Sequence, residues 1–420
     1  MYQRTVLDNQ LRVLTSSMPH TRSVSIMVCV GAGSRYESAE TAGLSHFIEH
    51  LPFKGTQRWP DAGAVSEAIE GVGGVMNAST DREMTVFWVK VPQTHFKQAF
   101  AVLMDMILNP LLDPEEVEKE REVIQEELRM TKDIPSYRVD LLIDEVLWPD
   151  QAMGRDVGGT EESVANLTQV QIREYMEQQY NPANTVVAVT GNVTHEEVAG
   201  MLADATAQWK PLAPLAWESV VDGQRQTTVR VEQRRTDQSH VCLALPGIPL
   251  DHPDRYALTM LNVILGDGMS SRLFMNLRER RSLAYDVSSS TSFFRDCGSM
   301  VIYCGVEPKK TRDAVRAVVS ELDLMRETPP VTELNKAKEY TKGRLMLRME
   351  DTRAVASWLG SQELLQGKVS SPDEVAENID AVETEDVSRV ARDLFQQDLL
   401  RLAVVGPHRG EKGFLNLLKL

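Results

Sequence analysis

The feature that most constrains the fold is an alternation of short β-branched runs with amphipathic helical stretches along the 420-residue chain. The runs "VSIMVCV", "TVFWVKV" and "NTVVAVTGNV" are typical of strands, whereas "AGAVSEAIEGV" and "EEVEKEREVIQEELRM" are typical of helices. Long helices interleaved with strands of the antiparallel type favour an α+β fold. A chain of this length is too long for one ordinary core and fits two domains of about 200 residues each.

The second half of the chain restarts much as the first does. The stretch "SHVCLALPGIPLDHPDRYALTMLNVIL" reads as a strand, a loop and an apolar-periodic helix, and so does "SVSIMVCVGAGSRYESAETAGLSHFIEHL" in the first half. Between them, "WKPLAPLAWESVVDGQ" carries prolines and little periodicity, which is typical of a linker. We therefore expect two similar domains, residues 1–212 and 226–420, joined by a linker at 213–225, each a mainly antiparallel sheet packed with helices.

The composition narrows the classes of partner and location. Lysine and arginine total 45 against 61 aspartates and glutamates, a formal net charge of −16, which disfavours nucleic acid and anionic membranes and suits basic or neutral ligands. The first residues lack an apolar signal-peptide core, and no stretch approaches the roughly 18 apolar residues of a membrane span. We expect a soluble cytoplasmic protein whose four cysteines are buried free thiols.

The stretch "GLSHFIEHLPFKGT", residues 43 to 56, contains two histidines whose spacing suits metal binding. On a helix His46 and His50 lie on one face, so both imidazoles can reach one metal ion. Glu49 lies beside His50, where a carboxylate can take a proton from water and later pass it to a leaving amine. The spacing H-x-x-E-H is typical of one class of catalytic zinc motifs. Helical His/Glu pairs are also common on surfaces, so a structural origin stays open at this point.

A two-histidine zinc site needs a third protein ligand, which the helix "DPEEVEKEREVIQEELRM" can supply. Asp113 suits the N-cap and Pro114 the first helical position. Glu120 and Glu127 lie on or beside the apolar face, and carboxylates near a buried face need a cation or strong donors. We expect Glu127 to be a ligand and Glu120 to lie one shell behind it, the alternative being a solvated acidic helix surface. The apolar face consists of Val117, Ile124 and Leu128.

These segments resemble the pitrilysin/insulysin family of zinc metallopeptidases with the inverted motif, and within it the short-chain group similar to mitochondrial processing peptidase and its bacterial relatives. The resemblance runs through nearly the whole chain. The matching segments are "LDNQLRVL", "GAGSRYE", "HFIEHLPFKGT", "GGVMNASTDREMTVFWV", "EKEREVIQEELRM", "MGRDVGGTEESVANLT", "YNPANTVVAVTGNV" and "LGDGMSSRLFMNLRERRSLAYDV".

The resemblance implies a role for each residue of the histidine helix and its partner helix. It implies one zinc ion per chain, with Glu49 as the general base and Glu120 as a supporting carboxylate. Glu126 is the adjacent competitor of the third ligand, but it would point about 100° away on the helix. The implied zinc ligands are His46, His50 and Glu127.

The resemblance also implies residues that hold the substrate. Arg278 and Tyr285, seven residues apart in "RERRSLAY", would donate hydrogen bonds to the oxyanion, although the residues alone also fit an exposed arginine and a packed tyrosine. Gly74, Asn77 and Ala78 in "GGVMNAST" would receive the main chain of an extended peptide, the alternative being a glycine turn with an Asn-mediated bend.

Pro52 departs from the apolar residue that relatives commonly carry. Proline removes the amide that would bond to the carbonyl of Ile48, and its ring crowds the same turn. We therefore expect the histidine helix to end within about one turn of His50.

In the resembling family, chains of this length form one half of a clamshell of two chains. The implied function is a zinc-dependent endopeptidase for short or unfolded peptides, with a zinc site in domain 1–212 and a zinc-free domain 226–420 that contributes Arg278 and Tyr285. The partner would be a second copy or a homologous chain. The alternative is a non-catalytic or partner-dependent assembly subunit, although such members usually lack ligand or base residues. The natural substrate and cleavage preference do not follow from the sequence.

Overall fold

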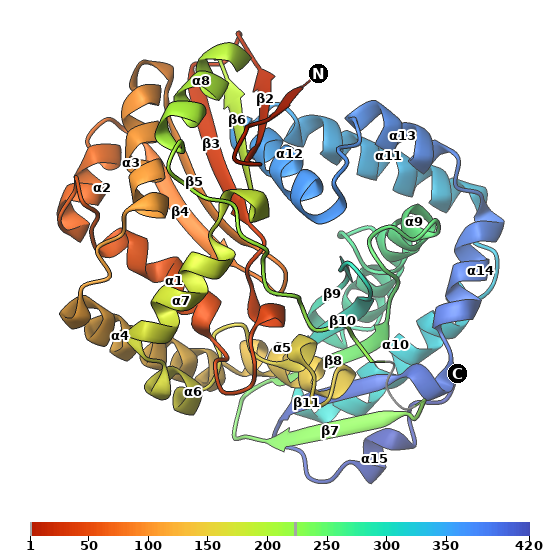
Figure 1. Ribbon diagram of the computed structural model, residues 1–420. Coiled ribbons are helices and arrows are strands. Elements are labelled where there is room, and N and C mark those ends of the chain that lie inside the picture. The colour runs from red at the N-terminus through yellow and green to blue at the C-terminus, as the bar shows by residue number, and fades with distance from the viewer. Residues whose placement is uncertain (1, 222–224) are drawn as a thin grey trace. The chain divides into compact units, whose positions relative to one another are not determined.

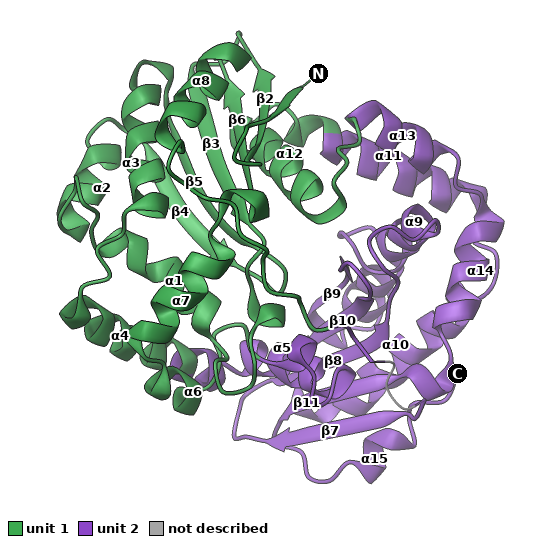
Figure 2. Cartoon of the chain, in the orientation of Figure 1, with its two compact units in different colours: residues 1–128, 156–218, 346–371 green, residues 129–155, 219–345, 372–420 purple. Residues whose placement is uncertain are grey.

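A computed structural model of the chain describes residues 2–221 and 225–420 (Figure 1). It divides into two compact units, each made of several chain segments (Figure 2). Unit 1 consists of residues 1–128, 156–218 and 346–371, and unit 2 of residues 129–155, 219–345 and 372–420. The expected linker, 213–225, includes residues 222–224, which lie outside the described residues, and residues 213–221 form no helix or strand.

Unit 1 is built on a six-stranded sheet with the order β1-β2-β6-β3-β5-β4. Its neighbouring strands are antiparallel except for the parallel pair β2 and β6. The central strands β3 and β6 are buried along almost their whole length, which explains the runs of consecutive apolar residues at 26–30 and 186–189. The strands are β1 (Gln3–Val6), β2 (Arg12–Ser17), β3 (Ser23–Val30), β4 (Val75–Thr80), β5 (Thr85–Pro92) and β6 (Thr185–Gly191).

Helices cover both faces of this sheet (Figure 1). Ile26 and Val28 of β3 join the core formed with α1 and α3, whereas Met27 and Cys29 join the core on the α12 side. Successive strand residues point to opposite faces, so β3 serves two cores. The helices are α1 (Leu44–His50), α2 (Ala62–Glu70), α3 (Phe96–Leu108), α4 (Pro114–Asp133), α6 (Glu161–Asn166), α7 (Gln169–Gln179), α8 (His195–Ala205) and α12 (Thr352–Gln366).

Unit 2 repeats the topology of unit 1 in a five-stranded sheet of order β7-β11-β8-β10-β9. Only β7 and β11 are parallel, and they match β2 and β6 of unit 1 in chain order and position. The shared topology confirms the expected pair of similar α+β domains with mainly antiparallel sheets. The strands are β7 (Thr228–Gln233), β8 (Ser239–Pro246), β9 (Ala284–Phe293), β10 (Gly298–Val306) and β11 (Arg401–Gly406).

One helix from the first half of the chain belongs to unit 2. Val139 and Ile143 of α5 pack with Cys242 of β8 and Ala403 of β11. The helices are α5 (Pro135–Leu147), α9 (Arg255–Leu265), the π-helical η6 (Phe274–Arg280), α10 (Thr311–Met325), α11 (Val331–Arg348), α13 (Pro372–Asp380), α14 (Thr384–Leu394) and α15 (Lys412–Leu415).

Short 3₁₀ turns complete the described chain. The turns are η1 (Ser34–Tyr36), η2 (Leu51–Lys54), η3 (Gln93–His95), η4 (Ala152–Gly154), η5 (Pro182–Asn184), η7 (Pro308–Lys310) and η8 (Gln397–Leu399).

None of the described helices has the length and apolar character needed to cross a membrane. The cytoplasmic location stays a prediction.

Candidate metal centre

The histidine helix α1 is capped by a carboxylate from the preceding loop. Glu37, only 2% exposed, accepts hydrogen bonds from the amides of Gly43 at 2.8 Å and Ser45 at 2.6 Å. An anion there satisfies amides that the helix leaves unpaired and complements the positive end of the helix. This role could not be predicted from the sequence, because Glu37 lies six residues before Gly43, outside the usual capping positions.

The other end of α1 confirms the prediction made from Pro52. The α-helix ends at His50, and Pro52 lies in the first turn of the 3₁₀ helix η2. Phe47 and Ile48 are buried in the core of unit 1, which fixes the rotation of the helix. His46 and His50 therefore project from the partly exposed face.

The partner helix α4 begins and packs as expected. The Asp113 carboxylate accepts from the amides of Glu115 at 2.8 Å and Glu116 at 3.4 Å, so it caps the helix. Glu120 is also buried on the core side, with 3% exposure. The apolar residues expected to face the core are all buried: Val117, Ile124 and Leu128.

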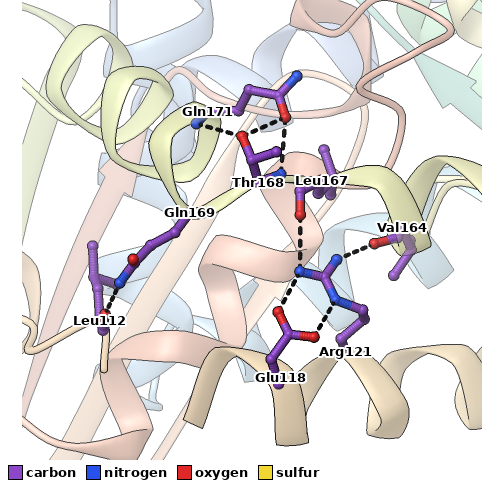
Figure 3. A network of polar contacts seen from close by, with 8 residues as sticks. All are labelled: Leu112, Glu118, Arg121, Val164, Leu167, Thr168, Gln169 and Gln171. Atoms are coloured by element: carbon purple, nitrogen blue, oxygen red, sulfur yellow. Dashed lines mark hydrogen bonds and ion pairs between the residues drawn. The ribbon is translucent and has the colours of Figure 1, made fainter. Parts of the chain in front are cut away.

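Arg121 ties α4 to the end of α6 (Figure 3). Its guanidinium donates to the carbonyl oxygens of Val164 and Leu167, the latter at 2.8 Å, and pairs with the Glu118 carboxylate on the same helix. The last carbonyls of a helix lack partners within it, so a guanidinium there is well placed. This contact fixes the axial position of α4 and of the glutamates on it.

The structure brings the three expected metal ligands together. The Nε2 atoms of His46 and His50 face each other at 3.2 Å, and Glu127 Oε2 lies 3.9 Å from each. Candidate ligand atoms of these three residues all lie within 4.8 Å of one another. Within residues 2–221 and 225–420, these three side chains form the cluster of His, Cys, Asp or Glu that could hold a metal ion. Glu126 is not part of this cluster.

The donor set fits zinc. Glu120 Oε1 lies 2.7 Å from His50 Nδ1, so Nδ1 carries the proton and Nε2 keeps a lone pair for a metal. Lys54 Nζ lies 2.5 Å from the other Glu120 oxygen and completes the pairing of this buried carboxylate. Two imidazole nitrogens and one carboxylate, with a fourth position left open, are a catalytic zinc set.

Burial and neighbouring charges set the protonation of the site. Burial lowers the pKa of His46, and His50 lowers it further, against the opposing effect of nearby carboxylates. Burial also acts to lower the pKa of His50, but the hydrogen bond and charge of Glu120 outweigh it and raise that pKa. Burial acts to raise the pKa of Glu120, but its bonds to His50 and Lys54 outweigh burial, so this pKa is lowered. Glu120 therefore stays an anion at neutral pH.

Glu49 differs from the other acids of the site. It lies on α1 between the two histidines and is partly buried. No described residue forms a hydrogen bond or ion pair with its carboxylate, whereas Glu120 is held on both oxygens. A carboxylate beside a metal site and without a protein partner is available to a water molecule.

Arg278 and Tyr285 lie together in unit 2. The Arg278 guanidinium carbon is 5.2 Å from the centre of the Tyr285 ring and 4.9 Å from that of Phe274. Arg278 lies on η6, and Tyr285 lies on β9, the edge strand of its sheet. Tyr285 is 74% exposed, so the alternative of a packed tyrosine is wrong.

The three expected substrate-binding residues lie at or beside the edge strand β4. A Cβ on Gly74 would lie 2.6 Å from Val91 Cγ1 and 2.9 Å from atoms of Ile69, so packing already requires glycine there. Asn77 Oδ1 accepts from the Ala78 amide at 2.8 Å. Among the described strands β4 pairs only with β5, which leaves its other edge open, and the substrate roles stay predictions.

Known proteins match the chain over nearly its full length. Residues 12–161 match the family model described as insulinase (peptidase family M16), and residues 166–340 match the model described as peptidase M16 inactive domain. An uncharacterized zinc protease of Streptomyces coelicolor is 38% identical over 96% of this chain and 89% of its own length. An uncharacterized zinc protease of Bacillus subtilis is 34% identical over 97% and 98%.

Solved structures share the fold. A protease from Helicobacter pylori superposes with a TM-score of 0.91 at 22% identity, covering 96% of this chain and 99% of that one. The peptidase M16 inactive domain from Pseudomonas fluorescens gives a TM-score of 0.89 at 18% identity, covering 98% and 99%.

Proposed function

The chain belongs to the insulinase family of zinc peptidases, peptidase family M16, and on that premise we propose that it is a zinc-dependent endopeptidase for short or unfolded peptides. The observation that carries the proposal is the convergence of His46, His50 and Glu127 beside the unpaired carboxylate of Glu49. A purely structural cluster has no need of a free acid at that position.

His46, His50 and Glu127 would hold one zinc ion per chain, which when bound lowers the pKa of a water molecule and polarises a peptide carbonyl. Glu49 takes the proton from the attacking water and returns it to the leaving amine. Glu120 keeps the His50 ring oriented by accepting its Nδ1–H.

Arg278 and Tyr285 would donate hydrogen bonds to the carbonyl oxygen as negative charge develops there. Both are donors on neighbouring positions of unit 2, and Tyr285 is open to solvent. We propose that the working form is a clamshell of two chains, homodimer or heterodimer with a homologous chain, in which this pair serves the zinc site of the other chain. The presence of both sets of residues in one sequence supports a homodimer with two composite sites.

Substrates would bind as extended strands along the open edge of β4, near Asn77 and Ala78. Main-chain pairing of this kind recognises any extended peptide and gives broad specificity. The net charge of −16 favours peptides that carry basic residues.

A second candidate is a non-catalytic or partner-dependent assembly subunit. The match of residues 166–340 to a model described as an inactive domain favours it. Against it, residues 12–161 match the peptidase model and contain the zinc ligands and the base.

Metal analysis of protein purified without added zinc, together with digestion of a mixed peptide library, tests the proposal. We expect about one zinc per chain and cleavage that a chelator stops. Glu49→Gln should keep zinc and lose hydrolysis, and Glu127→Gln should lose zinc, whereas the matched control Glu126→Gln should keep both. If the protein bound no metal and showed no chelator-sensitive cleavage, the proposed enzymatic function would be refuted. A mass measurement by size exclusion distinguishes a monomer from a dimer.

A further inference from the structure

The two histidines of the metal centre differ in how their second ring nitrogen is held. His50 Nδ1 donates to Glu120 at 2.7 Å. His46 Nδ1 is buried and has no hydrogen-bond partner in the described structure. When Nε2 of an imidazole faces a metal, Nδ1 carries a proton, and a buried N–H of this kind is normally bonded to an acceptor. An acceptor for His46 is therefore the missing part of the site.

The loop after η4 lies against the start of α1. A Cβ on Gly159 would overlap the carbonyl oxygen of Ala42, and Gly159 also has a positive φ of 80°. Ser163 Oγ donates to the same carbonyl at 2.7 Å. The consecutive glycines of "RDVGGTEES" therefore allow this loop to approach the histidine helix backbone to backbone.

Gly158 lies next to both the His46 ring and the Asp156 side chain. A Cβ at this position would lie 3.6 Å from His46 Nδ1, 3.5 Å from Asp156 Oδ1 and 2.8 Å from Leu128 Cδ2. The imidazole nitrogen and the carboxylate oxygen are therefore close neighbours of the same residue. Because a Cβ would also clash with Leu128, only glycine fits here without displacing its neighbours.

The carboxylate of Asp156 is held in this position. Its Oδ1 accepts from the Gly158 amide at 2.9 Å, which directs the side chain back over the loop. Asp156 plays no part in the mechanism described above.

We propose that Asp156 positions His46 by accepting, through one bridging water molecule, the hydrogen bond of its Nδ1–H. Such a water accepts from the N–H and donates to the carboxylate. Asp156 then does for His46 what Glu120 does for His50. The inference rests on the proposed function, because a metal at Nε2 is what places the proton on Nδ1.

Zinc affinity tests this role without depending on activity. Metal-free wild type, Asp156→Ala and Asp156→Asn are titrated with zinc against a competing fluorescent chelator, with the unfolding midpoint of each metal-free variant as a check on folding. Loss of a carboxylate that orients a metal-binding histidine weakens metal binding by about 10- to 100-fold. Asp156→Asn keeps the size of the side chain and an oxygen for the Gly158 amide. Glu162→Gln, an exposed acid in the same segment, is the matched control and should bind zinc as wild type does.

A ¹⁵N spectrum of histidine-labelled, zinc-loaded protein gives the second readout. The chain has eight histidines, so the spectrum contains few signals. The Nδ1 resonance of His46 should shift in Asp156→Ala, while that of His50 stays in place. Folded Asp156 variants that bind zinc within twofold of wild type, or that leave the His46 resonance unmoved, would overturn the inference alone. A wild-type chain that binds no zinc would overturn the proposed function as well.

Discussion

Replacing Glu37 by alanine should loosen the histidine helix from its N-terminal end. The carboxylate is 2% exposed and accepts from two amides at the start of α1, those of Gly43 and Ser45. Alanine leaves both amides buried without this acceptor.

The expected magnitude follows from the two hydrogen bonds. A bond to a charged group contributes about 1.5–3 kcal/mol, so losing both removes about 3–6 kcal/mol. Part of this is offset, because alanine also removes the cost of burying a carboxylate. The net loss should be about 2–4 kcal/mol, at or above the upper end of measured N-cap substitutions. Glu37→Gln keeps one acceptor oxygen and should fall between alanine and wild type.

Hydrogen exchange is the appropriate assay, since a chain with two compact units need not unfold in one step. Exchange of the peptide that contains α1 (Leu44–His50) reports the local opening free energy. A loss of about 2–4 kcal/mol corresponds to roughly 30- to 900-fold faster exchange, at 1.36 kcal/mol per factor of ten. Measurement is made on metal-free protein, so that bound zinc does not mask the change.

Glu40→Ala is the matched control, because Glu40 lies in the same loop with an exposed side chain. It should change the opening free energy by no more than about 0.5 kcal/mol. If α1 exchanged no faster in Glu37→Ala than in Glu40→Ala, the capping argument would be refuted. If both variants accelerated exchange equally, the loop as a whole, and not the carboxylate of Glu37, would hold the helix.

Three further predictions concern groups around the site. The raised pKa of His50 contributes stability that is lost as pH rises through it, and the lowered pKa of Glu120 contributes stability that is lost as pH falls through it. The stability difference between metal-free wild type and Glu120→Gln should therefore peak between roughly pH 4.3 and 6.5 in urea titrations, and a flat difference would contradict this. Lys54→Met should lower the free energy of unfolding by about 1–3 kcal/mol at pH 7, because it removes one partner of the buried Glu120 carboxylate. The loss should be smaller at pH 4. An equal loss at both pH values would show that the substitution affects packing alone. Gly74→Ala should lower the free energy of unfolding by about 1–3 kcal/mol, because the new methyl group would lie 2.6 Å from Val91 Cγ1. An unchanged unfolding midpoint would mean that β4 shifts to accommodate the methyl group at no cost.

The helices and strands that could be predicted from the sequence are those whose apolar residues recur at a regular spacing. The runs quoted for strands coincide with β3 (Ser23–Val30), β5 (Thr85–Pro92) and β6 (Thr185–Gly191). Burial on one or both faces imposes the pattern, so it can be read without the structure. The partner of each element cannot be read in the same way, and the placement of α5 in unit 2 and of α12 in unit 1 depends on which apolar face meets which sheet.

In the candidate site, too, the residues with helical spacing could be predicted and those in loops could not. His46 and His50 at i, i+4 and Glu120 and Glu127 at i, i+7 were predictable because helical periodicity puts each pair on one face. Their convergence is a tertiary fact, which the need of a two-histidine zinc site for a third ligand suggested and the resemblance implied. Other contributors lie in loops or at helix ends, where no period marks them, and they are Glu37, Lys54 and Asp156.

The length of α1 explains why so much of the site lies outside the motif. Seven residues are too few for a helix to persist in water on its own, so propensity cannot hold the two histidines in register. The helix is instead defined by contacts from elsewhere in unit 1: the Glu37 carboxylate at its start, the turn containing Pro52 at its end, and the core packing of Phe47 and Ile48 along its buried side. The proposed metal binding therefore depends on those contacts as much as on the motif itself. The same histidine spacing on a helix without them would be the surface pair that the sequence alone could not exclude.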